Sequence, residues 1–494
     1  MNQRMRRIAL LAGLAVALGS GPSVAVEEGD VILLDPTFEQ EDAGPATQPA
    51  TGPATGPATG LSTEPSPEPA TADSSDFALG LDRLWLETAA FTRSSSQAAG
   101  TGYGQTKASA SWRPDDTWEW AAALRVDGSL QTGARHVQDT RLDYGDSFVR
   151  YRDMERRVTL GAQTVPWGRV DEVAPTDRLS VQDISRFILD EIGERRRAVP
   201  MLRWEEFTDT TKLDVILIPE FRAAELPDQD SVWYPIDQER GMVLGMPSDP
   251  MLKALLGVGS VGDNAHSGGA GGGLRFSQSL SGLDYALTAQ RTRLSLPYFQ
   301  LDPSVRAALL AGASPEVAVA MGEPGHHTFE GQHPYTNVVG GDLGLVVGGA
   351  TARVEAAWLS DVPVTTEDLR METVRGIDWV AGIEFYPGDA DTRINLQLTG
   401  HHLLNPPKVL DEVDIVSLSG QVEAEWTQGR WSTRLRMAAD LNHQNLYFNP
   451  EIVWLGGRSQ EFYGGLHYFE GEDGTFGGFF SDNTNLAVGW RMSY

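Results

Sequence analysis

The C-terminal residues Asn483–Tyr494 alternate strictly between two kinds of position, and this constrains the fold more than any other feature. Leu486, Val488, Trp490, Met492 and Tyr494 fall on one face of an extended strand, and Asn485, Ala487, Gly489, Arg491 and Ser493 fall on the other. Since successive side chains of a strand point to opposite faces, this strand needs an apolar environment on one side and tolerates water on the other. A soluble sandwich satisfies that requirement, and so does a membrane barrel.

The N-terminal residues predict export and therefore favour the barrel. A basic stretch precedes an apolar run from Ile8 to Leu18, and a small-residue cleavage site ends at Ala25, so residues 1–25 are expected to be a cleaved signal peptide. No later run reaches the about 18 apolar residues that a transmembrane helix needs. The chain contains no Cys, which excludes a lipoprotein anchor and disulfides.

Residues 26–76 differ in composition from the rest of the chain. They include the repeat PATQPATGPATGPATG and several acidic residues, but neither Lys nor Arg. Such a segment cannot bury a core, so we expect a disordered linker that acts as a spacer or binds peptidoglycan, a periplasmic protein or an efflux partner. The net charge of −29 argues against nucleic acid as a partner, because binding phosphates needs a basic surface.

From Phe77 onward, alternating segments are joined in pairs by short turns. In VDIVSLSGQVEAEW (413–426) and WSTRLRMAADLN (431–442), charged residues repeat along one face, and Trp426 and Trp431 flank the turn, where an interfacial aromatic girdle would lie. Counting such turns, and adding one strand at each end, gives about 18 strands, an even number as in bacterial barrels. The sequence thus predicts an all-β membrane protein, a single antiparallel transmembrane β-barrel over residues 77–494 with helical loop insertions.

The connections at the two ends of the expected strands differ in length. Short turns alternate with longer segments at 168–199, 221–266 and 298–334, as periplasmic turns alternate with extracellular or inserted loops in outer-membrane barrels. The last strand is expected to close the barrel against the first, so that no edge is open in lipid. Its terminal aromatic resembles the signal for the barrel-assembly machinery. We therefore expect the protein in the outer membrane of a Gram-negative bacterium, in contact with its lipid.

Charged side chains on the inward faces are candidate lumen residues. They are Arg353, Glu355, Arg393, Glu423, Glu425, Arg434 and Arg436, with Asn395 and Gln397 beside them. They predict cross-strand ion pairs that fill and stiffen the barrel, a charged ladder that selects solutes, or both together.

The segment 180–192 predicts an amphipathic helix. Ser180 and Asp183 resemble a capping box, and apolar residues recur at helical spacing. The basic run after this helix consists of Arg195, Arg196 and Arg197. The helix and the basic run are expected either to fold into the lumen as a constriction or to form a rigid surface loop.

Two other loop segments, Asp249–Gly259 and Asp302–Gly322, also predict helices. Both begin with Asp-Pro, a favourable N-cap followed by a favourable first position. Both are unusually apolar for loops in water, so they are expected to plug a wide lumen or to offer a surface to apolar ligands.

The segment Val158–Phe221 resembles an uncharacterised family of proteobacterial outer-membrane barrels. The resemblance rests on a G-x-Q-x-x-x-W-G strand end, a Pro-x-Asp step and a Val-Pro-Met strand, which here are Gly161, Gln163, Trp167, Gly168, Pro175, Asp177, Val199, Pro200 and Met201. Ala-Pro-Thr replaces the family's usual Asn-Pro before the Asp, so no role of that Asn carries over. The resemblance implies export or passage of lipid-like compounds beside inner-membrane efflux pumps. The size is also similar to that of the barrel that exports alginate.

Known enzyme motifs do not occur in the sequence: G-x-S-x-G, H-E-x-x-H and P-loop patterns are all absent. GGAGGG (268–273) is expected to open a strand rather than to bind a dinucleotide. The loop histidines His326, His327 and His333 could bind a metal, but such spacing in a loop is usually incidental. His401 and His402 could belong to a barrel phospholipase or protease, but no matching nucleophile is recognisable. We therefore predict no enzymatic activity, metal or cofactor.

Together these features predict an outer-membrane channel or transport protein that passes a hydrophobic or amphipathic compound. One alternative is a water-filled diffusion porin, general or cation-preferring. Another is a plugged barrel that anchors a periplasmic assembly through residues 26–76.

Overall fold

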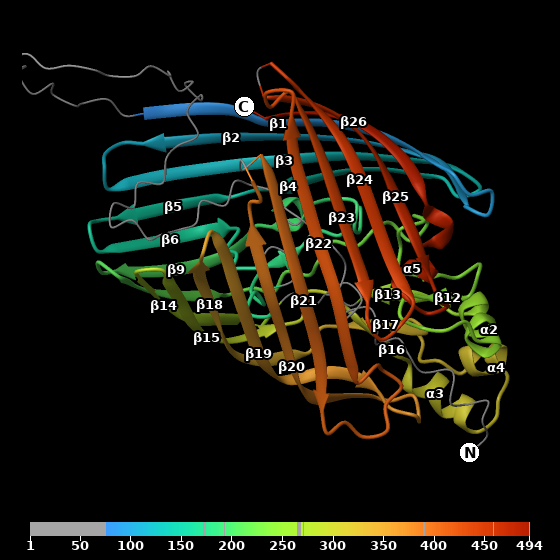
Figure 1. Ribbon diagram of the computed structural model, residues 1–494. Helices are drawn as coiled ribbons and strands as arrows, with labels where there is room; N and C mark the ends of the chain where they lie inside the picture. The colour runs from blue at the N-terminus through green and yellow to red at the C-terminus, as the bar shows by residue number, and fades with distance from the viewer. Residues whose placement is uncertain are drawn as a thin grey trace, which may run out of the picture.

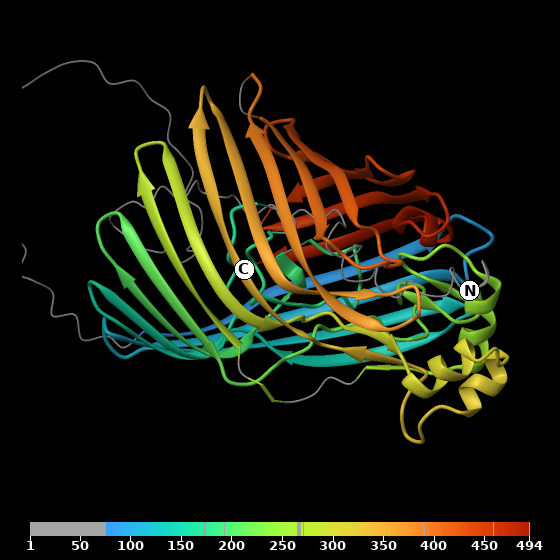
Figure 2. The same ribbon diagram turned by 90° about the horizontal axis from the view of Figure 1, so that it is seen from below.

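The computed structural model describes residues 76–494, except 171–173, 192, 264–267, 270, 389–390, 458 and 494. The predicted signal peptide, residues 26–75 of the predicted linker and Tyr494 lie outside the described residues. The described chain forms one large antiparallel sheet that curves around a lumen (Figures 1 and 2).

The large sheet has 19 strands. They are β1 (Asp76–Phe91), β2 (Ala98–Arg113), β3 (Trp118–Gly133), β4 (Val137–Tyr144), β5 (Ser147–Arg152), β6 (Arg156–Gln163), β9 (Val199–Phe207), β10 (Thr211–Ile218), β14 (Gly271–Leu280), β15 (Leu283–Arg293), β18 (Tyr335–Val347), β19 (Ala350–Thr365), β20 (Met371–Phe385), β21 (Thr392–Leu404), β22 (Asp414–Trp426), β23 (Trp431–Asp440), β24 (Asn445–Gly456), β25 (Gln460–Gly471) and β26 (Asn485–Ser493).

The sheet is closed, as the terminal alternation predicts. β26 pairs antiparallel with β1, from Arg83 opposite Ser493 to Phe91 opposite Asn485. Both β4 and β5 pair with β3, on either side of Gly145, and so share one place in the wall. The result is an 18-strand antiparallel barrel, which confirms the predicted fold class. Closure matters because an unpaired strand edge in lipid would leave backbone N–H and C=O groups without partners.

The two faces of the wall have opposite character. On β26, Val488 is 57% exposed on the outer face, whereas Ala487 and Arg491 are buried on the inner face. Aromatic pairs gather beside the short turns on the outside: Trp426 stacks on Trp431 with ring centroids 5.5 Å apart. The outer band and this girdle are those of a transmembrane barrel, and the inner face is polar.

The long connections emerge at the opposite end from the short turns. They contain the hairpin β7 (Val181–Gln182) and β8 (Arg196–Arg197), β11 (Ile236–Asp237), β12 (Met242–Val243), β13 (Val261–Asp263), β16 (Tyr298–Leu301), β17 (Phe329–Gln332), α2 (Pro250–Val258), α3 (Pro303–Leu310), α4 (Pro315–Ala320), α5 (Phe476–Phe479), η2 (Gly193–Arg195) and η3 (Ser481–Asn483). The helices α2, α3 and α4 lie together at this end (Figure 2). None of the helices in the described part is both long and apolar enough to span a membrane.

Apolar residues of these connections form a core of their own, which we call the loop cap. It is built mainly from residues 232–261, 299–329 and 469–480 and buries Leu252, Leu255, Val305 and Leu309. The prediction of α2 is confirmed: the Asp249 carboxylate accepts hydrogen bonds from the N–H groups of Met251 and Leu252. Most of the apolar side chains that suggested a plug or ligand surface therefore pack against one another, whereas Val258, Val317 and Met321 remain exposed.

The helix prediction for 302–322 is confirmed, whereas that for 180–192 is wrong. The segment 302–322 forms two helices, because the chain turns at Gly312 (φ 91°) and Ser314 caps a new helix. Residues 180–191, the described part of the other segment, form no helix: Phe187 has φ 56°, and Val181 pairs with Arg197 in a hairpin. Its apolar residues have helical spacing, but tertiary contacts bury them in an irregular chain.

A charge on the outer face should destabilise the barrel. Replacing Val488 by Arg should cost about 2–4 kcal/mol, because a guanidinium near the middle of the apolar band must leave water. Equilibrium unfolding in urea in the presence of lipid vesicles measures the change. Val488→Leu, which keeps the site apolar, is the control, and equal stability of the two variants would contradict the assigned outer face.

Candidate functional site

The connection from β6 to β9 runs through the lumen, and we call residues 164–198 the crossing loop. One part of it is bound to the wall formed by β18, β19 and β20. The N–H and the hydroxyl of Thr176 both donate to Oε1 of Glu355 at 2.7 Å, and the N–H of Arg169 donates to its Oε2 at 3.1 Å. Arg178 forms an ion pair with Asp378 on β20.

Another part of the crossing loop is bound to β1 and β2. The Glu194 carboxylate pairs with both Arg83 and Lys107, and Arg186 pairs with Glu87. In the order of strands around the barrel, β1 and β2 are separated from β18–β20 by about half the ring in either direction. The crossing loop therefore spans the lumen from one wall to the opposite one.

The charges that hold the loop are mutually compensated. Burial alone would raise the pKa of Glu194, but Lys107 and Arg83 outweigh it and lower the pKa to about 2. Burial raises the pKa of Asp190 above its usual value, against the effect of Arg186, whose Nη1 donates to it at 2.7 Å. Buried ion pairs of this kind lose several kcal/mol when one partner is removed, so they fix the position of the loop.

The apolar side of the same segment is inserted into the loop cap. Ile184, Phe187 and Ile188 are buried there, and the Phe187 ring lies 4.7 Å from Phe480 and 5.6 Å from Phe476. The crossing loop is thus held by ion pairs at the wall and by apolar packing at the cap.

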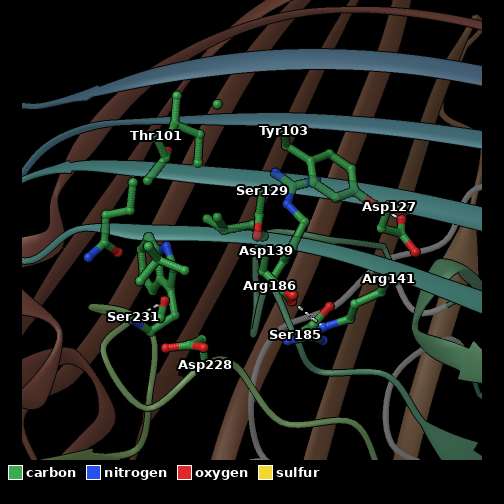
Figure 3. A pocket seen from close by; sticks show the side chains of 16 residues that line it. Thr101, Tyr103, Asp127, Ser129, Asp139, Arg141, Ser185, Arg186, Asp228 and Ser231 are labelled. Carbon is green, nitrogen blue, oxygen red and sulfur yellow. Dashed lines mark hydrogen bonds and ion pairs between the residues drawn. The ribbon is translucent and has the colours of Figure 1, made fainter.

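A recess lies between the crossing loop, the loop cap and β2–β4 (Figure 3). It contains about 640 Å³ of empty space, including space open to solvent. Its polar lining residues include Thr101, Tyr103, Asp127, Ser129, Gln131, Asp139, Arg141, Ser185, Arg186, Asp228 and Ser231. Trp233, Leu130, Val137 and Leu189 contribute apolar side chains, and most of the exposed surface of the recess is apolar. Polar groups set into a mainly apolar surface suit a small amphipathic solute.

Most predicted lumen residues lie on the inner face in ion-pair clusters. Glu384 accepts from Arg353 at 3.2 Å and from Arg393 at 2.7 Å. Glu423 accepts from Arg434 at 2.9 Å. These contacts agree with the prediction of ion pairs that stiffen the wall.

The remaining predicted wall residues have other environments. Arg436 donates to Oδ1 of Asn449 at 2.7 Å, and buried Asn395 and Gln397 lie on the inner face of β21. Glu425 is exposed at the turn end of β22.

The basic run of the crossing loop is not gathered into one cluster. Arg195 donates to the carbonyl oxygens of Asp190 and Ile188, both at 2.9 Å, and so fixes the loop itself. Arg196 pairs with Asp177, and Arg197 pairs with Asp143 and Glu225. The predicted lumen residue Asp183 pairs with Arg125 on β3 at 3.0 Å.

The residues of the family resemblance build the attachment of the crossing loop to the wall. Gly161 and Gly168 have φ of 138° and 129°, and a Cβ on Gly168 would lie 2.4 Å from Ala174 and 3.1 Å from the Glu355 carboxylate. The buried Trp167 indole donates to Asp214 at 3.2 Å. Gln163 and Pro175 are buried, Asp177 accepts from Ser180, and Pro200 lies in β9.

Sequence reasoning missed the strongest anchors, namely Thr176, Arg186 and Glu194. Glu87 was equally missed, although the alternation of β1 places it on the inner face. The sequence did contain a signal for an ion pair within the loop, because Arg186 and Asp190 are four residues apart, the spacing of a helical ion pair. That spacing supported the helix that the structure does not have.

The histidines that the sequence singled out are placed separately. His333 lies 3.0 Å from Asp263, and His401 lies 2.5 Å from Asp378 on the inner face. Nε2 of His401 has no hydrogen-bond partner among the described residues, so no hydroxyl nucleophile completes a triad there. The described residues also contain no group of three or more His, Asp or Glu side chains arranged to hold a metal.

No protein family and no curated protein matches this chain. Similar solved structures include OmpF of Salmonella typhi in complex with daunomycin, with 8% identity over 85% of this chain and 98% of that one and a TM-score of 0.40. Wzi of Escherichia coli, described as a carbohydrate-binding β-barrel involved in group 1 capsule assembly, has 12% identity over 85% of each chain and a TM-score of 0.40. OccAB4 of Acinetobacter baumannii has 8% identity over 85% and 97% of the chains and a TM-score of 0.43. Likenesses this low add nothing about function.

Removing one charge should release the crossing loop. Glu194→Gln leaves Arg83 and Lys107 without their carboxylate, so we expect faster amide hydrogen exchange in residues 183–196 of the detergent-solubilised protein. Glu323→Gln, at an exposed position of the loop cap, is the control. Unchanged exchange in the Glu194 variant would show that the Glu194 ion pairs are not needed to hold the loop.

A buried acid links the rim of the wall to the loop cap. Asp411 accepts from the N–H of Thr365 at 2.7 Å and from the Tyr298 hydroxyl at 3.4 Å. Burial raises the pKa of Asp411 to about 7, from an ordinary value of 3.8. Because the folded-state pKa is raised, the contact is most stable below about pH 4 and weakens as the pH rises through about 7.

The link should therefore be pH-dependent. We divide the amide hydrogen exchange rates of residues 298–301 and 365–369 by the intrinsic rates of an unstructured chain at the same pH. The resulting rates should be faster at pH 8.5 than at pH 5.5. Asp411→Asn should abolish the difference, since the amide does not ionise in this range. A difference that persists in that variant would assign the effect to another group.

Proposed function

We propose that this protein is an outer-membrane channel for small solutes, with the crossing loop as its constriction and the recess as the point where solute is held. The observation that carries the proposal is the attachment of the loop to opposite walls by buried ion pairs. A loop held in that way narrows a lumen at a fixed depth and exposes polar groups to what passes. The barrel type, with an apolar outer band and a girdle beside short turns, supports placement in the outer membrane.

The prediction of a hydrophobic or amphipathic solute receives partial support from the described residues. Most large apolar side chains of the segments 249–259 and 302–322 pack within the loop cap, but Val258, Val317 and Met321 are exposed. The mainly apolar exposed surface of the recess favours an amphipathic solute. The implied relation to lipid-exporting barrels, the assembly-machinery contact and the role of the linker remain predictions.

Conductance of the full chain in a planar bilayer tests the proposal. We expect small, steady steps and, given the net charge of −29, a reversal potential that favours cations. Replacing residues 183–191 by a Gly/Ser segment of equal length should increase the step size, because the anchors at Arg186 and the cap are lost.

The control replaces the short turn 208–210 in the same way and should leave the conductance unchanged. Correct folding of each variant is checked by its heat-modifiable migration in electrophoresis. Silence from folded wild type and folded loop variant alike would overturn the channel proposal and favour the plugged anchor.

A further inference from the structure

Two arginines face outward at the loop end of the wall. On β15, the outward positions run from Leu287 through Ala289 to Arg291 and Arg293, and Arg291 is exposed. Ala289 pairs with Val339, which in turn pairs with the outward-facing Trp358. Arg291 is thus the next outward-facing residue of β15 after the apolar band, at the depth where lipid headgroups begin.

These arginines are held in place by aromatic and polar neighbours. The guanidinium carbons of Arg291 and Arg293 lie 4.9 Å and 4.8 Å from the centroid of the Tyr335 ring. Nη1 of Arg291 donates to Oδ1 of Asn337 at 3.4 Å. A Cβ on Gly269 would lie 2.2 Å from the Tyr335 hydroxyl, so the ring is closely confined. Both guanidinium groups are therefore preorganised beside Tyr335. Arg291 is exposed on the outer surface, whereas Arg293 is half-buried at the rim, where its guanidinium carbon also lies 5.5 Å from the centroid of the Phe221 ring.

Their charge is not compensated by the described part of the protein. Inner-wall arginines such as Arg203 and Arg275 pair with carboxylates, whereas Arg291 and Arg293 have no carboxylate within ion-pair distance among the described residues. Asp361, two strands away, is engaged by the hydroxyls of Ser360 and Thr373.

We propose that Arg291 and Arg293, supported by Tyr335 and Asn337, form a binding site for the phosphate group of an anionic glycolipid in the outer leaflet. Guanidinium groups bind phosphate in a bidentate manner, and stacking on an aromatic ring keeps their N–H groups available. Facing lipid without a counter-ion would be costly, and a headgroup phosphate at this depth provides one. This inference rests on the proposed outer-membrane placement, but it is independent of solute passage.

The test titrates the detergent-solubilised full chain with bis-phosphorylated lipid A and, separately, with its dephosphorylated form. We expect the phosphorylated lipid to bind at least about tenfold more tightly. The double variant Arg291→Gln/Arg293→Gln should lose that preference. The control Arg156→Gln, an outward arginine at the turn end that lies 3.9 Å from Glu206, should keep it.

Equal binding of the two lipids by the wild type overturns the proposal, and so does an undiminished preference in the folded double variant. If the double variant does not fold, the wild-type comparison still decides. Conductance separates this inference from the proposed function, because outer-surface substitutions should leave it unchanged. If the double variant loses the preference for the phosphorylated lipid but conducts normally, the lipid site is supported. If the wild type prefers that lipid but does not conduct, only the channel proposal is overturned.

Discussion

Closure of the backbone hydrogen-bond ladder is the constraint on which the rest of the structure depends. In lipid, an unpaired strand edge leaves polar groups that nothing can satisfy, so β26 must meet β1. Once the wall is closed, every strand has one face toward lipid and one toward the lumen. The apolar outer band and the polar inner face are both consequences of that division.

The inner face creates a second requirement, because charged side chains in a confined lumen need partners. Some find them across neighbouring strands, as Glu384 does with Arg353 and Arg393. Others find them on the crossing loop, which brings Arg186 and Glu194 to β1 and β2 and Thr176 to Glu355. The position of the crossing loop and the stability of the wall therefore depend on the same charges.

The loop cap shows why apolar loops are a poor indicator of the solute. A long connection at the end of a barrel can bury its apolar residues against other connections, as α2, α3 and α4 do. Such a cap needs no ligand to explain its composition. It also holds Ile184 and Phe187, which links the position of the crossing loop to the packing of distant segments.

The sequence by itself determined the strands, the turns and the face of each wall residue, because a period of two is read locally and one face must meet lipid. It also determined the caps of α2 and α3, since Asp249 and Asp302 act on N–H groups two and three residues away. Only the tertiary structure decided the course of residues 180–191. Their apolar residues match a helix in spacing, but they are buried in the loop cap, while Arg186 and Glu194 of the same loop reach the wall. Partners such as Glu87 are far away in the chain, and contacts across a closed barrel leave no local pattern to read.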